Sequence, residues 1–341
     1  MNFNTHDWMS KLPSDRKLSE ILMPGSHDAG LYEVTGSSVP NSWVITQEKT
    51  IGEQLKAGVR CFDLRVYNKR DFPGVSNLFG GKLGLYVGHF AEPVFKGHSI
   101  GGGFGPPFWR VLFDIKSFFL QGQSSKETVI LRLSHIKKSN LFSTIYFVLS
   151  ILSDNLYLKN KKITIGNEKL RNLRGKIITI YENSIDKHLK QIFKDFNSLE
   201  SSSKLLKFKD SVVLFKKAGD MKDIISPEKK KGKLILRGKY SNKRRLESVF
   251  EKQERRLSDW SSAIEEDRNK YDGELMQLYW TSTGSATSKS RKIIKNTRAL
   301  WTRDAVRQLT GLIQQHEPNI VWMDFCNSAK SLTILRNNNF R

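Results

Sequence analysis

Cysteine and long apolar runs are both scarce in this sequence. Its 341 residues include only two cysteines, Cys61 and Cys326, too few for a disulfide framework or a zinc cluster. We therefore expect both to be small buried core residues, a usage compatible with a reducing compartment. The most lipid-like run, Leu141 to Leu152, falls short of the about 20 apolar residues that a spanning helix needs, so we predict a helix packed on a sheet.

A signal peptide is also lacking at the amino terminus. Residues 1–20 are polar and charged and contain no apolar core segment. Classical secretion is not supported, and we expect a protein that is cytoplasmic or exported by another route.

Acidic residues are few beside the basic ones. The chain has 57 Lys and Arg against 34 Asp and Glu, for a net charge of +23, which implies an anionic partner surface. Residues 201–245 hold 15 basic and 4 acidic residues, including Lys229 to Lys231 and Lys243 to Arg245. This basic, insert-like region predicts peripheral docking on anionic phospholipid membranes, with a solvated loop as the alternative. No nucleic-acid-binding motif is present, so we expect no nucleic-acid partner, and we expect a monomer.

Apolar runs alternate with helical or loop stretches along the whole chain. This alternation predicts βα units, a parallel sheet and, at this length, a single (β/α)8 barrel domain over residues 1–341. The expected strands are Glu20 to Met23, Val59 to Tyr67, Gly84 to Val87, Val129 to Leu133, Ile177 to Tyr181, Leu234 to Arg237, Met276 to Thr281 and Ile320 to Phe325. The expected helices are Ile51 to Ala57, Trp109 to Leu120, Leu141 to Leu152, Leu246 to Asp259 and Trp301 to Gln315. The glycines and prolines of Gly101 to Pro107 predict an irregular loop.

Three short segments place ionisable side chains at the ends of strand-like runs. Pro24 to Gly30 (PGSHDAG) contains His27, Gly58 to Arg65 (GVRCFDLR) contains Arg65, and Leu85 to His89 (LYVGH) ends in a second histidine. Two histidines suit paired acid and base roles near neutral pH, and an arginine suits a phosphate oxygen. The segments therefore predict a metal-free site that cleaves a phosphodiester.

Strand geometry places two of these side chains together. Residues two apart in a strand share a face, so Asp63 and Arg65 point the same way, and we expect Asp63 to hold Arg65 in place. His27 follows the first expected strand and His89 the third, so both should reach the same rim of the barrel.

These segments, in this order, resemble the X domain of phosphatidylinositol-specific phospholipase C. The resemblance implies a distorted (β/α)8 TIM barrel in a single α/β domain. It extends over nearly the whole chain and is weakest in the middle third. Further matching segments are Trp8-Met9, Leu12-Pro13, Trp43 to Gln47, Ile51 to Leu55, Glu127 to Leu131, Gly175 to Glu182 and Val321 to Phe325.

The resemblance to the bacterial members implies a role for each motif residue. His27 would be the general base that deprotonates the inositol 2-hydroxyl, with Asp324 orienting it. His89 would protonate the departing glycerol oxygen, supported by Asp28, while Arg65 would neutralise charge on the phosphoryl group. The products would be diacylglycerol and a cyclic inositol phosphate.

Other positions bear on metal and substrate. Calcium-dependent relatives have an acidic ligand where Arg65 stands and a glutamate where Ser134 stands, so we expect no catalytic metal and no cofactor. Glu182 replaces a bacterial arginine on the inositol ring, and the Tyr181-Glu182 pair resembles the X-domain-only proteins of animals. Tyr240 aligns with an aromatic residue that stacks on inositol. Tyr240 and Glu182 are therefore the expected substrate-binding residues.

Two other functions stay open from the sequence. One is a metal-dependent phosphodiesterase on the same barrel, such as a glycerophosphodiesterase or sphingomyelinase D, although these need a carboxylate pair where Asp63 and Arg65 supply one carboxylate. The other is a lipid-binding barrel without turnover. The joint presence of four residues argues against it: His27, His89, Arg65 and Asp324.

Overall fold

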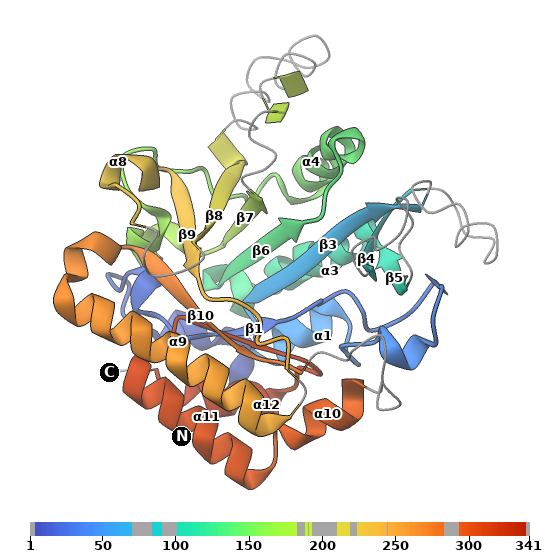
Figure 1. Cartoon of the computed structure of the whole chain (residues 1–341). Helices are drawn as coiled ribbons and strands as arrows, with labels where there is room; N and C mark the ends of the chain where they lie inside the picture. Colours follow the sequence, from blue (N-terminus) through green and yellow to red (C-terminus); the bar gives the residue numbers. More distant parts are fainter. Residues whose placement is uncertain are drawn as a thin grey trace.

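Eight parallel strands close into a barrel in the computed structural model (Figure 1). The structure describes residues 4–69, 84–90, 101–182, 188–189, 191–192, 210–218, 224–243, 245–282 and 293–338. The barrel closes because β1 pairs in parallel with both β11 and β3. The barrel strands, in the order of their neighbours, are β1 (Met23–Ser26), β3 (Cys61–Asn68), β6 (Thr128–Ser134), β7 (Lys176–Glu182), β8 (Val213–Ala218), β9 (Lys233–Arg237), β10 (Glu274–Trp280) and β11 (Ile320–Met323). The predicted (β/α)8 barrel is confirmed.

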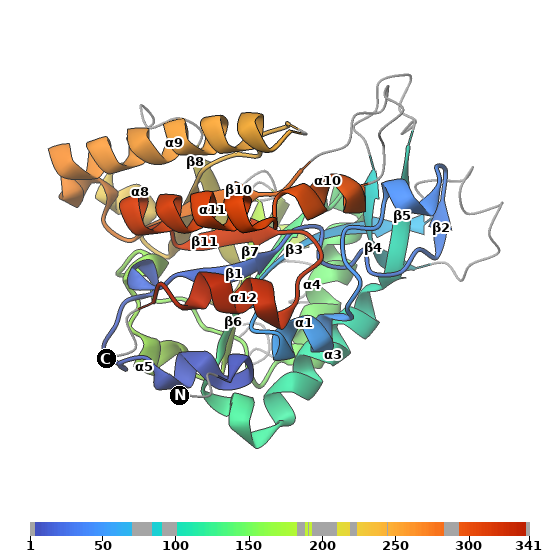
Figure 2. The ribbon, with the colours of Figure 1, turned by 90° about the horizontal axis from the view of Figure 1, so that it is seen from below.

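A small antiparallel sheet extends one wall of the barrel. β3 continues beyond its barrel neighbours and pairs with β4 (Leu85–Phe90), which pairs with β5 (Gly102–Pro107) and then β2 (Gly36–Ser37). Figure 2 shows this side sheet on the side of the molecule opposite the chain termini. The prediction that Gly84 to Val87 forms the third barrel strand is therefore wrong: the segment forms a strand, but outside the barrel.

The glycine-rich segment after it is also a strand, against the prediction of an irregular loop. A Cβ at Gly102 would lie 2.2 Å from the carbonyl oxygen of His89, and one at Gly105 would lie 2.4 Å from that of Gly30. These glycines permit close backbone approach within the side sheet instead of ending a strand.

The fifth barrel strand, β8, was not predicted and falls inside the basic region 201–245. β9 lies there as well, so the expected insert-like character does not apply to residues 213–218 and 233–237, which are barrel frame. The sequence hides β8 because its short apolar start is followed at once by two lysines. Residues 201–209, 219–223 and 244 of this region lie outside the described part of the chain.

The first strand begins later than predicted. β1 starts at Met23 and runs through Pro24 and Gly25, which read as a turn in the sequence. A Cβ at Gly25 would lie 2.9 Å from the side chains of Ile320 and Trp322, so only glycine fits between β1 and the large residues of β11. The strand thereby delivers His27 directly to the end of the barrel.

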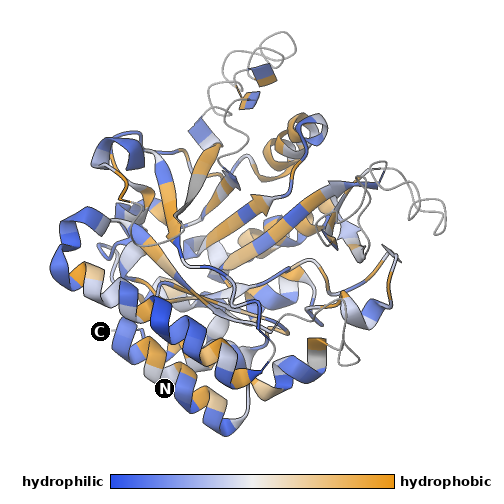
Figure 3. Ribbon diagram, in the orientation of Figure 1, coloured by the Kyte–Doolittle hydropathy of each residue, from blue (hydrophilic) through white to orange (hydrophobic). Residues whose placement is uncertain are grey.

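Helices surround the barrel, and the five predicted ones are present, although the one predicted over Leu246 to Asp259 continues to Glu266. One core cluster fills the barrel with residues such as Ile130, Ile178 and Trp322, and a larger one lies between the strands and the helices. Figure 3 shows hydrophobic residues along the strands and a largely hydrophilic α9 outside them. The helices are α1 (Ile51–Lys56), α3 (Phe108–Leu120), α4 (Lys138–Leu152), α5 (Leu170–Leu173), α8 (Pro227–Lys230), α9 (Leu246–Glu266), α10 (Ile293–Ala299), α11 (Arg303–His316) and α12 (Ser328–Leu335). Short 3-10 helices are η1 (Thr5–Lys11), η2 (Leu18–Glu20), η3 (Asn41–Trp43), η5 (Gly122–Lys126), η6 (Ile165–Asn167) and η8 (Arg268–Tyr271).

Two expectations from scarce features are met. Cys61 and Cys326 are buried and free. Among the described helices, none combines the length and the apolar character needed to cross a membrane.

Candidate active site

The predicted catalytic residues meet at the carboxyl end of the barrel strands. His27 and Asp28 follow β1, and Asp324 follows β11. Arg65 lies in the second half of β3. His89 comes from β4 of the side sheet, which runs back along β3 toward the barrel. The histidine thus reaches the site from a different element than predicted.

Asp28 is the centre of the cluster. Its Oδ2 atom lies 2.6 Å from Nδ1 of His89 and 3.2 Å from Nε2 of His27, and its Oδ1 atom lies 2.8 Å from Nε of Arg65. Burial disfavours the charged form, yet Arg65 and the two histidines hold the pKa of the Asp28 carboxyl well below its usual range. Asp28 is therefore an anion shared by three cationic or proton-carrying groups.

His27 sits between two carboxylates. Its Nδ1 atom lies 2.8 Å from Oδ1 of Asp324, as predicted, so Asp324 fixes the orientation of the ring. Burial alone would lower the pKa of His27, but Asp28 and Asp324 outweigh it and raise the pKa above the ordinary value. The side chain of Gln47 also holds this loop, because its Nε2 donates to the backbone carbonyl oxygen of His27 at 2.9 Å.

Arg65 is held by Asp28, and the prediction that Asp63 holds it is wrong. Burial opposes the charge on Arg65, but the neighbouring Asp28 raises its pKa above the ordinary value, with Asp63 a weaker influence. The side chain of Arg65 is 12% exposed. Its two terminal nitrogens bond none of the described residues, so they are available for a ligand oxygen.

Asp63 belongs to a second polar layer beneath this cluster. It accepts a hydrogen bond from the Tyr240 hydroxyl at 2.9 Å and lies 3.8 Å from Nε of Arg132. Arg132, on β6, also donates to the Tyr279 hydroxyl at 3.1 Å. Burial opposes ionisation of Asp63, but Arg132 and then Arg65 lower its pKa.

Sequence reasoning missed Arg132. Its signal was a basic residue in an otherwise apolar strand, two positions before Ser134 and therefore on the same face. Arg132 is 5% exposed and points into the barrel toward Asp63. A guanidinium thus lies inside the barrel one layer below Ser134.

The two expected substrate-binding residues differ in their placement. The Tyr240 ring lies 4.9 Å from the His27 ring and 4.2 Å from the Tyr279 ring, measured between centroids. Glu182 ends β7 and contacts none of the cluster described above, although its charge acts on His135. His135, directly after β6, lies beside the site. Burial and then Arg65 lower its pKa.

A cation would have to compete with arginine in this site. His27, Asp28 and Asp63 offer three potential ligand atoms within 4.8 Å of one another. Arg65 and Arg132 already compensate the two carboxylates at 2.8 Å and 3.8 Å. The residues therefore fit a divalent ion poorly.

A cavity of about 600 Å³ lies elsewhere, at the amino-terminal end of the barrel. Trp260, Tyr271 and His316 are among the residues that line it, and none of the catalytic candidates is. The site is thus identified by its side-chain geometry and not by this cavity.

Comparison with known proteins gives relatives in sequence and in fold, although no protein-family model matches the chain. The chain is 29% identical over 190 residues to a 1-phosphatidylinositol phosphodiesterase of Listeria monocytogenes, covering 54% of the chain and 51% of that protein. It is 29% identical over 153 residues to the human PI-PLC X domain-containing protein 2, covering 38% of the chain and 43% of that protein. The matches thus span about half or less of these relatives.

A solved structure shares the fold over nearly the full length. The phosphatidylinositol-specific phospholipase C of Staphylococcus aureus, described in a study of its membrane binding, superposes with a TM-score of 0.62 at 16% identity and 98% coverage of both chains. These matches confirm the resemblance to phosphatidylinositol-specific phospholipase C and X-domain proteins that the motifs indicate.

Proposed function

We propose that this chain is a phosphatidylinositol-specific phospholipase C, because it is similar to such enzymes in sequence and in fold. It cleaves the bond between glycerol and phosphate in a phosphoinositide, as a phosphoric diester hydrolase whose first step is a phosphorus-oxygen lyase reaction. The observation that carries the proposal is the sharing of one carboxylate, Asp28, by two imidazoles and a guanidinium. Such a grouping supplies a base, an acid and a fixed cation within one phosphate's reach.

His27 is the general base in this proposal. Asp324 holds Nδ1, so Nε2 faces the cluster, where it is paired with Asp28 until a substrate hydroxyl takes its place. Nε2 accepts the proton of the inositol 2-hydroxyl as that oxygen forms its bond to phosphorus. The reacting nucleophile therefore comes from the substrate, and the ring geometry of the inositol supplies proximity.

His89 is the general acid. Its Nδ1 atom is held by Asp28 at 2.6 Å, and its side chain is 38% exposed, so Nε2 can face a bound lipid. The glycerol oxygen leaves phosphorus with its electron pair and takes the proton from Nε2. Arg65 neutralises the charge that grows on the phosphoryl oxygen. The products are diacylglycerol and a cyclic inositol phosphate.

Tyr240 and Glu182 are the proposed contacts to the inositol ring. The Tyr240 ring lies beside His27 and is oriented by its bond to Asp63, so it can stack on the sugar face. Glu182 at the rim can accept hydrogen bonds from ring hydroxyls. The partner is an anionic phospholipid surface, on which the protein acts as a peripheral monomer that needs neither a metal nor a nucleic acid.

Hydrolysis of a panel of headgroup-labelled phospholipids, with and without excess EDTA, tests this function. We expect release of a water-soluble phosphate product from phosphatidylinositol, unchanged by EDTA because Arg65 stands beside the carboxylates. Activity lost to EDTA and restored by calcium or magnesium would favour the metal-dependent alternative. Binding to phosphoinositide vesicles without any product would favour a lipid-binding barrel.

A further inference from the structure

The basic cluster that the sequence suggested for membrane docking lies away from the active site. Lys229 and Lys230 belong to α8, which precedes β9 and so stands at the amino-terminal end of the barrel. Lys230 is 3% exposed, and its Nζ lies 2.6 Å from Oε1 of Glu274. Lys231 pairs with Glu228 at 2.7 Å. Lys230 is buried and paired, so it is not available for the membrane docking that the sequence predicted for the basic region.

A different surface has the composition of a membrane contact. On α3, Trp109 and Phe113 are each 47% exposed although both are large and apolar. They stand one helical turn apart, and their ring centroids lie 6.1 Å from each other in an edge-on arrangement. The opposite face of α3 is buried in the core, so this pair is not needed to hold the helix.

The neighbouring helix α4 repeats this pattern. Phe142 and Tyr146 are also one turn apart, with parallel rings whose centroids lie 6.4 Å from each other. Tyr146 is 46% exposed and Phe142 is partly buried. α3 and α4 pack against each other and bury their inner faces in the same core cluster. Figure 3 shows the hydrophobic character of α4.

Both aromatic pairs lie on helices that begin at the catalytic end. β6 ends at Ser134, which is level with Arg65 of β3, and α4 begins at Lys138. α3 begins directly after β5, whose last residue Pro107 pairs with Tyr86 of β4. The amino-terminal halves of α3 and α4 are therefore close to the rim where the catalytic residues lie.

The charges around the aromatic pairs are mostly positive. Lys116 lies on α3, and Lys137 and Lys138 stand at the start of α4, whereas Arg110 of α3 is already paired with Glu33 at 2.9 Å. Residues 128–152 contain no Asp or Glu, and α3 contains one, Asp114. Exposed Trp, Tyr and Phe beside Lys and Arg are typical of protein surfaces that sit at the interface of an anionic bilayer.

We propose that α3 and α4 form a docking face for an anionic phospholipid bilayer, with Trp109, Phe113, Phe142 and Tyr146 entering the headgroup region. Docking there would bring the adjacent β3 and β4 edge of the active site to the lipid. This inference rests on the proposed function in one respect, namely that the proposed substrate lies in a bilayer. A second copy of the chain is the competing occupant.

Vesicles of phosphatidylglycerol and phosphatidylcholine test the docking face without turnover. We expect Trp109→Ala/Phe113→Ala to weaken binding about tenfold or more and Phe142→Ala/Tyr146→Ala to weaken it less, because apolar area is removed from the contact. Leu158→Ala is the matched control, because Leu158 is 48% exposed but lies at the opposite end of the barrel. Its neighbour Leu156 bridges to Ile177 at the start of β7. This control variant should bind as the wild type does.

Two further measurements make the outcome unambiguous. Turnover of a short-chain soluble phosphatidylinositol should be the same in both double variants as in the wild type. If the wild type itself does not turn this substrate over, the proposed function is refuted, whereas the docking inference is still decided by vesicle binding. Quenching of Trp109 by brominated lipid, with Trp109→Phe as reference, should be seen in the wild type. Wild-type vesicle binding by both double variants would overturn the inference, as would a wild-type dimer that these substitutions dissociate.

Discussion

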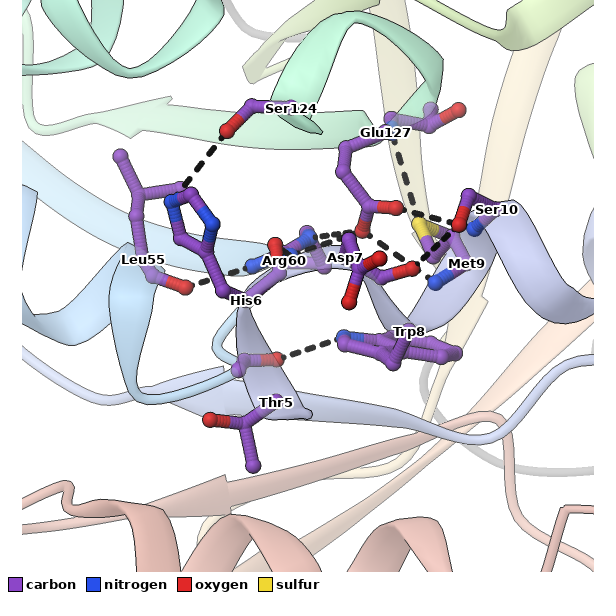
Figure 4. A network of polar contacts seen from close by, with 12 residues as sticks. Thr5, His6, Asp7, Trp8, Met9, Ser10, Leu55, Arg60, Ser124 and Glu127 are labelled. Atoms are coloured by element: carbon purple, nitrogen blue, oxygen red, sulfur yellow. Dashed lines mark hydrogen bonds and ion pairs between the residues drawn. The ribbon is translucent and has the colours of Figure 1, made fainter. Parts of the chain in front are cut away.

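Two buried ionic clusters lie at opposite ends of the barrel, and they differ in how fully their bonds are used. At the amino-terminal end, all five N–H donors of Arg60 are bound: to Glu127 through Nε and one terminal nitrogen, and to the carbonyl oxygens of Leu55, Val59 and His6 (Figure 4). Glu127 in turn accepts from the backbone N–H groups of η1. Arg60 therefore has no N–H donor left for a ligand.

The cluster at the carboxyl end is built from the same kinds of groups but is incomplete. Arg65 uses Nε on Asp28 and leaves its terminal nitrogens without a described partner. His89 is anchored through one ring nitrogen and exposed at the other end. The saturated cluster therefore stabilises the barrel, whereas the incomplete cluster at the other end keeps N–H donors for the proposed substrate.

The largest effect that tests this comparison is on turnover. His27→Ala or His89→Ala should lower kcat/KM by about 10²- to 10⁴-fold, the usual contribution of a general acid or base. Both variants should stay folded, and the melting temperature should fall less for His89→Ala, because the His89 side chain is 38% exposed whereas His27 is buried and pairs with Asp324. His316→Ala is a control histidine far from the site. Near wild-type turnover in either active-site variant would remove that histidine from the mechanism.

The converse effect is on stability. Arg60→Ala should lower the free energy of unfolding by about 3–5 kcal/mol, since it leaves the buried carboxylate of Glu127 without its cation. Urea denaturation measures this loss, and the double variant Arg60→Met/Glu127→Leu should recover much of it. Turnover per folded molecule should not change. A specific loss of kcat in a stable Arg60→Ala protein would break the distinction between the two clusters.

A smaller effect is expected in the layer beneath the site. Tyr240→Phe removes the hydroxyl that donates to Asp63, and a hydrogen bond to a charged group contributes about 1.5–3 kcal/mol. Because Arg132 still faces Asp63, we expect the free energy of unfolding to fall by an amount at the lower end of this range. KM for phosphatidylinositol should rise more than kcat falls if the ring positions inositol. An unchanged KM would contradict that role.

The smallest expected effect is a shift in pH dependence. A base must be neutral, so kcat/KM should rise with pH through the raised pKa of His27. Asp324→Asn removes one anion that raises this pKa, so the rising limb should move to lower pH in addition to any loss of rate. The raised pKa also stabilises the fold below the ordinary histidine pKa, about 6.5, and this contribution disappears as pH rises. Asp324→Asn should therefore lose more stability at pH 5 than at pH 8.

The sequence predicted the barrel and the residues that meet in the candidate site, but not all their partners. Alternating apolar runs identified seven of the eight barrel strands, and period-2 geometry placed Asp63 and Arg65 on one face. This local geometry could not reveal that Asp28, and not Asp63, pairs with Arg65. Asp28 lies in the turn after β1 and Arg65 in β3, so their contact depends on how the two strands are placed in the barrel. Arg132 was missed for a related reason: its partners Asp63 and Tyr279 are far away in the chain.

The side sheet shows where local rules fail. Gly102 and Gly105 carry the composition of a loop, yet tertiary contacts with His89 and Gly30 make them strand residues. β8 was hidden for the opposite reason, because lysines follow its apolar start. In both cases the neighbouring strands, and not local preference, determine the conformation.

Phosphorus NMR of the reaction with phosphatidylinositol in mixed micelles tests the central claim most directly. The account predicts that a cyclic inositol phosphate is the first phosphorus-containing product of the wild type, in the presence of EDTA, and that His27→Ala forms none at a comparable rate. The first appearance of phosphatidic acid or of a non-cyclic inositol phosphate would contradict the proposal that the substrate's own hydroxyl attacks phosphorus beside His27.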